Sequence, residues 1–227
     1  MEGLWNMVGF MVLCSILTNG AGAGLLLYEI WKNQEKYKGW KSGRPPGGFL
    51  LYCICMSLLT IGISVFVTVF YWENTFLFTL KRVMLLALLW PIGYTDFLTY
   101  RIPNLLIGAG LLGRGIVLAA ELIFARENLF PILLGEGIAG VVLFVAAVLC
   151  ALIVKRSIGG GDMKLLFVMG LYLGLQGTWS AVFLSLVVSF VVVIILLAAK
   201  KKTRKDVVPF GPALMIGTYL SVFLTGM

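Results

Sequence analysis

Two aspartates stand where long apolar segments meet polar turns, and their side chains are the ones best suited to chemistry. Asp96 ends one apolar segment, and Asp162 opens another directly after Gly159, Gly160 and Gly161. Two carboxyl groups held about 3 Å apart cannot both ionise, so they share one proton. The ionised group takes a proton from a water molecule, while the protonated group hydrogen-bonds a scissile carbonyl. If the two side chains meet, the sequence predicts hydrolysis by an aspartyl pair that titrates as a unit.

The absence of histidine excludes several kinds of catalytic site. Without histidine the chain can build neither a Ser–His or Cys–His nucleophile nor a HExxH zinc site. We expect no glycine-rich dinucleotide fingerprint anywhere in the chain. Four cysteines lie inside apolar segments and form no CxxC pair: Cys14, Cys53, Cys55 and Cys150. We therefore expect no zinc site and no disulfide framework, and a catalyst that uses no metal and no cofactor.

Each acidic junction also has a simpler interpretation. An aspartate after a glycine run, such as Asp162, commonly starts a helix because its carboxylate caps free backbone N–H groups. Asp96 precedes a polar turn and Ile102-Pro103, which opens the next helix, so an interfacial loop residue is the alternative there. Three successive glycines disfavour helix. They serve either as a plain hinge or as irregular backbone that admits an extended peptide.

The composition indicates an all-α polytopic membrane protein. Of the 227 residues, 60% are hydrophobic and only 12% are charged, and the mean hydropathy is +1.02. So few charges cannot cover a soluble domain, and the apolar runs are continuous, which favours helices over barrel strands. The net charge of +8 fits an excess of basic residues on one membrane face better than nucleic-acid binding, for which the sequence holds no motif.

About eight hydrophobic helices are expected from the length that a membrane span requires. They cover approximately residues 5–29, 48–71, 79–96, 103–123, 130–154, 162–177, 178–199 and 209–226. With this count, fourteen of the eighteen basic residues fall on one face, which predicts that this face is cytoplasmic and that both termini are extracytoplasmic. The four exceptions are Lys81, Arg82, Arg114 and Arg126. The same count puts Asp96 and Asp162 on one face.

The chain divides by its sequence into two parts. Residues 1–78 are expected to form an N-terminal two-helix segment with a basic cytoplasmic loop, 30–47, and residues 79–227 a core of six helices. Arg114 falls in the middle of an expected span, where a charge is costly. Glu121, seven residues on, shares its helical face, and Glu136 on the next helix is a second possible partner. A structural ion pair is therefore expected at Arg114.

Three motifs, in order over about residues 80–226, resemble those of the type IV prepilin peptidase family of GxGD intramembrane aspartyl proteases. Gly159-Gly160-Gly161-Asp162 fits GxGD, and Met163-Lys164-Leu165-Leu166 continues it. Asp96 with Arg101-Ile102-Pro103-Asn104 is similar to the first-aspartate motif of that family. Val208-Pro209-Phe210-Gly211-Pro212-Ala213 is similar to its C-terminal signature.

The resemblance implies that Asp96 and Asp162 are the catalytic pair of an endopeptidase. The substrate would be a prepilin or pseudopilin, cut at the cytoplasmic face of the inner membrane just after a basic leader ending in glycine. Motif residues with a substrate-positioning role would be Gly159, Gly160, Gly161, Lys164, Arg101, Pro103 and Asn104. Bifunctional family members also N-methylate the product with S-adenosylmethionine. Residues 30–47 are short and lack the cysteines of those members, so peptidase activity alone is expected here.

Two other classes of function remain open at this stage. Ion-coupled transporters and channels also use broken helices and intramembrane acids, but their sites tend to lie near the bilayer midplane. Both aspartates here are expected at the ends of spans, which favours the peptidase. A structural assembly protein is the third class, and it leaves both aspartates without a role. The oligomeric state does not follow from the sequence.

Overall fold

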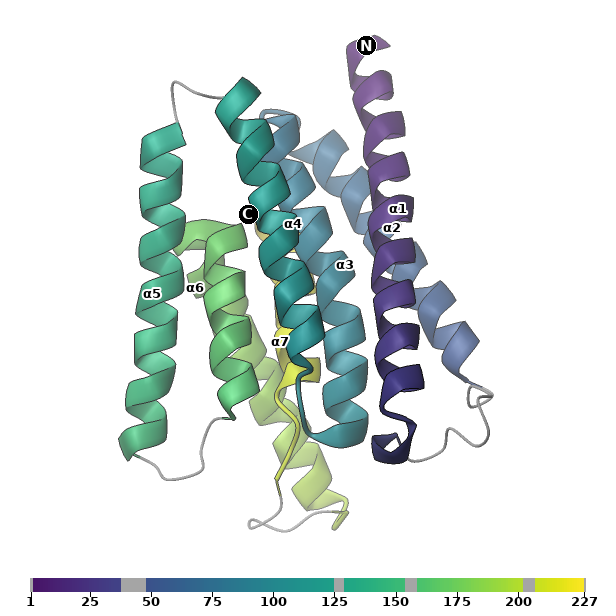
Figure 1. Ribbon diagram of the computed structural model, residues 1–227, viewed down its shortest axis with the longest axis vertical. Helices are drawn as coiled ribbons and strands as arrows, with labels where there is room; N and C mark the ends of the chain where they lie inside the picture. Colours follow the sequence, from purple (N-terminus) through teal and green to yellow (C-terminus); the bar gives the residue numbers. More distant parts are fainter. Residues whose placement is uncertain (1, 38–47, 125–128, 154–158, 202–206, 227) are drawn as a thin grey trace.

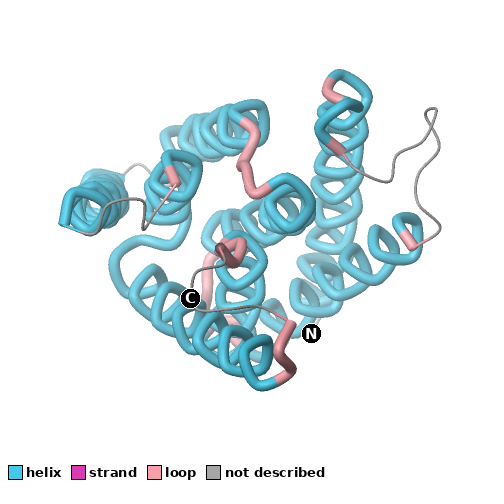
Figure 2. Tube along the Cα trace, turned by 90° about the horizontal axis from the view of Figure 1, so that it is seen from below, coloured by secondary structure: helices cyan, strands magenta, loops and turns pink. Residues whose placement is uncertain are grey.

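The computed structural model describes residues 2–37, 48–124, 129–153, 159–201 and 207–226, and all regular structure in these ranges is helical (Figures 1 and 2). A short 3₁₀ helix, Gln34–Lys36, follows the first α-helix. Seven α-helices occur in the described ranges: α1 (Glu2–Lys32), α2 (Phe49–Phe70), α3 (Phe76–Thr99), α4 (Asn104–Phe124), α5 (Leu129–Ile153), α6 (Gly160–Ala198) and α7 (Gly211–Thr225). The first six are long and apolar enough to cross a membrane, whereas α7 has 15 residues and is shorter than a typical span.

The prediction of eight helices is wrong, because the expected segments 162–177 and 178–199 are joined in α6. Within α6, Gly174 leaves the helical conformation, with φ 67° and ψ −173°. L-residues with a side chain essentially never occupy this region of the backbone map, so a glycine is required there. The helix is broken at this one residue, and a hydropathy profile cannot locate a break of one residue within a long apolar segment. We call the part of α6 before Gly174 the first arm and the part after it the second arm.

Contacts along α6 show that the chain reverses direction between the two arms, as Figure 1 also shows. The first arm begins beside the polar turn that follows α3, where Gly161 packs against Ile102. It ends near the other end of α3, where Arg82 donates hydrogen bonds to its last carbonyls. The second arm returns, since Leu196 lines the same cavity as Tyr100. The break at Gly174 therefore makes the first arm a short helix that starts at the Asp96 end of the bundle.

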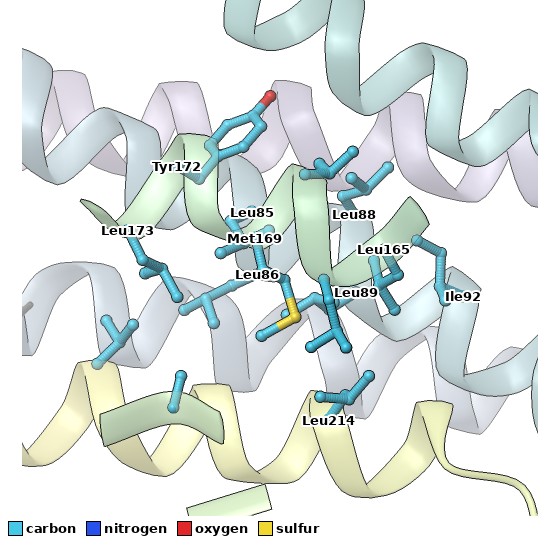
Figure 3. Packing of buried hydrophobic residues seen from close by; sticks show 14 of the residues in the cluster. Leu85, Leu86, Leu88, Leu89, Ile92, Leu165, Met169, Tyr172, Leu173 and Leu214 are labelled. Carbon is cyan, nitrogen blue, oxygen red and sulfur yellow. The ribbon is translucent and has the colours of Figure 1, made fainter. Parts of the chain in front are cut away.

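The hydrophobic core is built around α3. This helix contacts α1, α2, α4, α6 and α7, and most of its side chains are buried. Leu85, Leu86 and Leu89 of α3 pack against Met169 of the first arm and Leu214 of α7 (Figure 3). A helix apolar on all sides is expected in the middle of a bundle, and α3 is the span with the largest buried share among the six. Both ends of α3 are thereby held in fixed positions.

Five charged side chains lie buried at the end of the bundle opposite Asp96, in a cluster that we call the ion network. Each is at most 6% exposed: Lys81 and Arg82 of α3, Arg114 and Glu121 of α4, and Glu136 of α5. Lys81 and Arg114 each bind both glutamates. The ion pairs expected at Arg114 are thus confirmed. The network also explains three exceptions to the charge asymmetry, Lys81, Arg82 and Arg114, because buried charges do not report the membrane face; Arg126 lies outside the described residues.

Replacing Gly174 by alanine tests the reversal of α6. The new Cβ would meet no atom closer than 3.7 Å, so the penalty is backbone strain alone, about 1–3 kcal/mol. The midpoint of thermal unfolding in detergent should fall accordingly. Gly115→Ala in α4 is the matched control, because its Cβ would enter open space at an ordinary helical backbone, and its midpoint should stay the same or rise slightly. Equal midpoints for the two variants would contradict the reversal.

Candidate functional site

Asp96 lies in the last turn of α3 and is 5% exposed. The helix ends four residues later because Tyr100 adopts the left-handed conformation (φ 54°, ψ 33°) and donates its N–H to the Asp96 carbonyl at 2.8 Å. Pro103 and Asn104 then start α4, as expected for a proline at a helix start. This tight turn keeps the Asp96 carboxylate inside the bundle and excludes the simple interpretation of a loop residue.

Gly211, at the start of α7, holds the Asp96 carboxylate. Its backbone N–H donates to Asp96 Oδ2 at 2.8 Å. The first N–H groups of a helix have no partner within the helix and are natural donors to an anion. A Cβ on Gly211 would lie 2.8 Å from Asp96 Oδ2 and 2.9 Å from Asp96 Cβ, which is too close. Only glycine therefore permits this approach.

The sequence identified the segment around Gly211 but assigned the glycine no role in the site. The sequence feature that could have indicated such a role was the position of this glycine, between Phe210 and Pro212 at the start of an expected helix. Nothing in the spacing relates that position to Asp96, which lies 115 residues earlier in the chain. The contact depends on the packing of α7 against α3.

Asp162 lies in the first turn of α6 and is only partly buried as a residue. Its Oδ2 accepts the Gly159 N–H at 3.3 Å, so the helix-capping role suggested by the sequence is present. Its Oδ1 is buried and has no hydrogen-bond partner among the described residues. Burying a carboxylate oxygen without a partner is costly, which indicates that a substrate or water completes the site. One oxygen thus caps the helix and the other is available for chemistry.

The structure brings Asp96 and Asp162 together at one end of the bundle. Asp96 lies in the last turn of α3 and Asp162 in the first turn of α6, and each lies beside the polar turn that joins α3 to α4. Gly161 packs against Ile102, which fixes the start of α6 against the turn after α3. The end of α3, the start of α6 and the start of α7 therefore meet in one place, at the lower end of Figure 1. All three motifs found in the sequence contribute to it.

The remaining residues that the sequence assigned to the site lie around this pair. Lys164 Nζ donates to Asn104 Oδ1 at 2.9 Å, which joins the first arm to the start of α4. Arg101 is exposed, and its carbonyl accepts a hydrogen bond from Thr99 Oγ1 at 3.2 Å. Pro103 is half-buried in the turn. These residues lie in the turn after α3, at the start of α4 and in the first turns of α6, and so they surround the carboxylates.

The described part of the chain contains no cluster of side chains suited to holding a metal ion. Groups of three or more His, Cys, Asp or Glu side chains with metal-site geometry do not occur there. The expectation that no GxGxxG spacing occurs is wrong, because Gly108, Gly110 and Gly113 have this spacing, although they lie within α4 rather than after a strand. Gly110 and Gly113 instead allow close packing, since a Cβ would lie 2.6 Å from Leu88 or 2.8 Å from the Tyr172 hydroxyl.

The three glycines before Asp162 differ in how much space they leave, which gives a prediction. A Cβ on Gly161 would lie 3.0 Å from Ile102 Cβ, whereas a Cβ on Gly160 would have no atom within 4 Å. Gly161→Ala should therefore destabilise the fold by about 1–3 kcal/mol through overpacking. Gly160→Ala, its neighbour and control, should not lower the unfolding midpoint. The reverse order of midpoints would show that the start of α6 does not pack against Ile102.

Comparisons with known proteins identify a family match over the part of the chain that contains both aspartates. The chain matches the sequence model of the Type IV leader peptidase family over residues 83–198, a segment that contains both aspartates and ends before α7. It is also similar to the prepilin leader peptidase/N-methyltransferase of Bacillus subtilis (strain 168), with 29% identity over 139 residues. That alignment covers 61% of this chain and 53% of the relative, so the chain spans about half the length of the curated protein it matches. No solved structure matches the chain.

Proposed function

The chain belongs to the type IV leader peptidase family, and from this premise we propose that it is an intramembrane aspartyl endopeptidase. Its substrates are type IV prepilins or pseudopilins, from which it removes a basic leader peptide. The observation that supports the proposal is the location of Asp96 and Asp162 at the same end of the bundle, where the buried Oδ1 of Asp162 has no hydrogen-bond partner among the described residues. Residues 79–227 form the peptidase core, and residues 1–78 pack beside it through α1 and α2.

The mechanism follows from two carboxyl groups that share one proton. The ionised group removes a proton from a bound water, and the resulting hydroxide attacks the scissile carbonyl carbon. The protonated group donates a hydrogen bond to the carbonyl oxygen as negative charge develops on it. Collapse of the tetrahedral intermediate breaks the C–N bond, and the amine leaves with a proton from the pair. The Gly211 N–H fixes the orientation of Asp96 throughout these steps.

The excess of basic residues on one face supports an orientation in the inner membrane. We propose that the aspartate end faces the cytoplasm and that both termini are extracytoplasmic. Described basic residues expected on the cytoplasmic face lie at the aspartate end: Lys32, Lys36, Arg101, Lys164, Lys200 and Lys201. The others lie outside the described residues: Lys38, Lys41, Arg44, Lys155, Arg156, Lys202, Arg204 and Lys205. Inside-out membrane vesicles should cleave an added prepilin, and right-side-out vesicles should not. Cleavage by right-side-out vesicles alone would invert the orientation.

Peptidase activity is proposed without methyl transfer. The name of the Bacillus subtilis relative includes an N-methyltransferase activity, and that name describes the relative. Residues 30–47 hold no cysteine, in contrast to the cysteine-rich segment expected of bifunctional members. Purified protein given prepilin and S-adenosylmethionine should yield an unmethylated new N-terminus. A mass increase of one methyl group on the product would overturn this part of the proposal.

Incubation of detergent-purified protein with a panel of prepilins and pseudopilins tests the proposed function. Processing should appear as loss of the leader from at least one substrate. The same preparation, reconstituted in liposomes, should conduct no ions along an imposed gradient. Ion flux that depends on Asp96 or Asp162, without processing of any substrate in the panel, would favour the transporter class instead.

A further inference from the structure

The charges of the ion network do not balance. Lys81 and Arg114 form a closed square with Glu121 and Glu136, in which each base contacts both acids. Arg82 is the fifth member, and among the described residues it forms no ion pair although it is only 3% exposed. Its guanidinium carbon lies 3.4 Å over the centre of the Phe78 ring. A buried cation without an acidic partner needs another source of stabilisation.

Backbone carbonyls at the end of the first arm supply that stabilisation. Arg82 donates from Nη1 to the carbonyl of Tyr172 at 3.1 Å and from Nη2 to that of Leu173 at 3.3 Å. Arg114 donates from Nε to the carbonyl of Leu171 at 2.9 Å. These are the last carbonyls before the break at Gly174. The last carbonyls of a helix have no partner within it and carry the negative end of the helix dipole, so cations bind there favourably.

The ion network thus joins the far ends of the two helices that carry the aspartates. From Arg82 to Asp96 the helix α3 rises about 21 Å, and from Asp162 to Leu173 the first arm rises about 17 Å, at 1.5 Å per residue. The two segments run in opposite directions, meeting at the aspartates at one end and at Arg82 at the other. A shift of the first arm along α3 at the network would move Asp162 by the same distance.

Among the described residues, most of the side-chain hydrogen bonds between the first arm and its neighbours lie at the end of the arm that contacts the ion network. Gly170 packs directly on Gly140 of α5, which fixes the spacing between helices. Tyr172 donates its hydroxyl proton to the Gly110 carbonyl of α4 at 2.7 Å. The other end of the arm has the packing of Gly161 against Ile102, a 3.3 Å capping bond and the exposed contact of Lys164 with Asn104. Direct hydrogen bonds between the arm and α3 come from Arg82.

Stability alone does not account for such a network. Replacing a buried ion pair with apolar residues of similar volume is often neutral or stabilising, so buried charges are a poor way to gain stability. A fork of donors directed at two adjacent carbonyls is, in contrast, a precise way to fix a helix end. Resting on the proposed peptidase function, we infer that the ion network is a remote positioning device, in which Arg82 sets the place of Asp162 relative to Asp96.

Kinetics of Arg82 variants test this inference. Arg82→Gln removes the charge and the fork, and Arg82→Lys keeps the charge but loses the fork, which makes it the milder variant if the first folds poorly. Both should lower kcat for prepilin cleavage by about 10- to 100-fold with KM little changed, because a displacement of about 1 Å at a site has effects of this size. Arg82→Lys should be the less affected.

A matched control separates positioning from loss of stability. Asn19→Leu removes the hydrogen bond that Trp90 Nε1 donates to Asn19 Oδ1 at 3.0 Å, a buried connection of α3 to α1 rather than to α6. It should lower the unfolding midpoint but leave kcat near the wild-type value. If Arg82→Lys and Arg82→Gln lower the midpoint as Asn19→Leu does and leave kcat unchanged, the network is only structural and the inference is overturned.

A second readout does not depend on activity. In a background with the four native cysteines replaced, spin labels at Phe97→Cys and Lys164→Cys report the distance between the end of α3 and the start of α6. The distance distribution should shift or broaden in Arg82→Gln and stay unchanged in Asn19→Leu. An unchanged distribution in Arg82→Gln would overturn the inference. If the wild type cleaves no prepilin, the proposed function fails and the distances alone decide the positioning role.

Discussion

Replacing either aspartate by asparagine should abolish cleavage while leaving the fold intact. Asparagine has the shape of aspartate, and its carbonyl oxygen can still accept the Gly211 N–H at position 96 or the Gly159 N–H at position 162. It can neither take a proton from water nor share one with its partner. Asp96→Asn and Asp162→Asn should each lower kcat by about 10³-fold or more, in line with the contribution of general acid–base groups. Processing of a prepilin by purified variants measures the loss.

The double variant Asp96→Asn/Asp162→Asn tests whether the two carboxyl groups act as one catalytic unit. Groups that act as one unit have strongly non-additive effects, so Asp96→Asn/Asp162→Asn should be no slower than the slower single variant. Unfolding midpoints close to the wild type would show that the losses are chemical. Two separate sites would instead give losses that multiply, and cleavage that survives one of the single substitutions would exclude the aspartyl mechanism.

Gly211→Ala should have the second largest effect on activity. The new Cβ would come within 2.9 Å of both Oδ2 and Cβ of Asp96, so α7 or the end of α3 must move. Movement breaks the 2.8 Å hydrogen bond to the carboxylate and displaces Asp96 from Asp162. We expect kcat to fall by about 10- to 100-fold, the loss typical of a displacement of about 1 Å in a catalytic site. Prepilin cleavage under saturating substrate measures it.

Gly108→Ala serves as the control for this prediction. It makes the same chemical change in α4, where a Cβ would have no atom within 4 Å. Its kcat should equal that of the wild type. Wild-type activity in Gly211→Ala would mean that α7 does not hold Asp96, and the site would then consist of α3 and α6 alone.

Residue types and spacing predicted that Asp96 and Asp162 lie at the same end of the bundle, and they predicted one structural ion-pair contact. Few carboxylates occur in the apolar segments, so Asp96 and Asp162 were conspicuous, and counting spans by their basic flanks put them at one end. Arg114 in mid-span needed an acidic partner, and Glu121 and Glu136 were the acids within reach along the helices. The structure confirms those ion pairs. In each case the cost of an unpaired charge in an apolar segment limited the alternatives.

Features that depend on three-dimensional packing were not accessible in this way. The sequence suggested two separate helices divided between residues 177 and 178, whereas the structure joins them in α6 and breaks the helix at Gly174 alone. Arg82 reaches carbonyls 90 residues away, and Gly211 reaches a carboxylate 115 residues away. Nearly every residue has a backbone donor and acceptor. A hydrogen bond to a backbone group therefore does not require a particular amino acid at that position, and the sequence does not reveal it. The charge asymmetry counted Lys81 and Arg82 as exceptions, although they are members of a buried network.

The mass of the products formed from a full-length prepilin by the purified protein tests the central claim most directly. The account predicts one cut, directly after the glycine that ends the basic leader, for the wild type, and no product for Asp162→Asn. Cleavage at unrelated bonds, or the same product from Asp162→Asn, would contradict an aspartyl pair formed by Asp96 and Asp162.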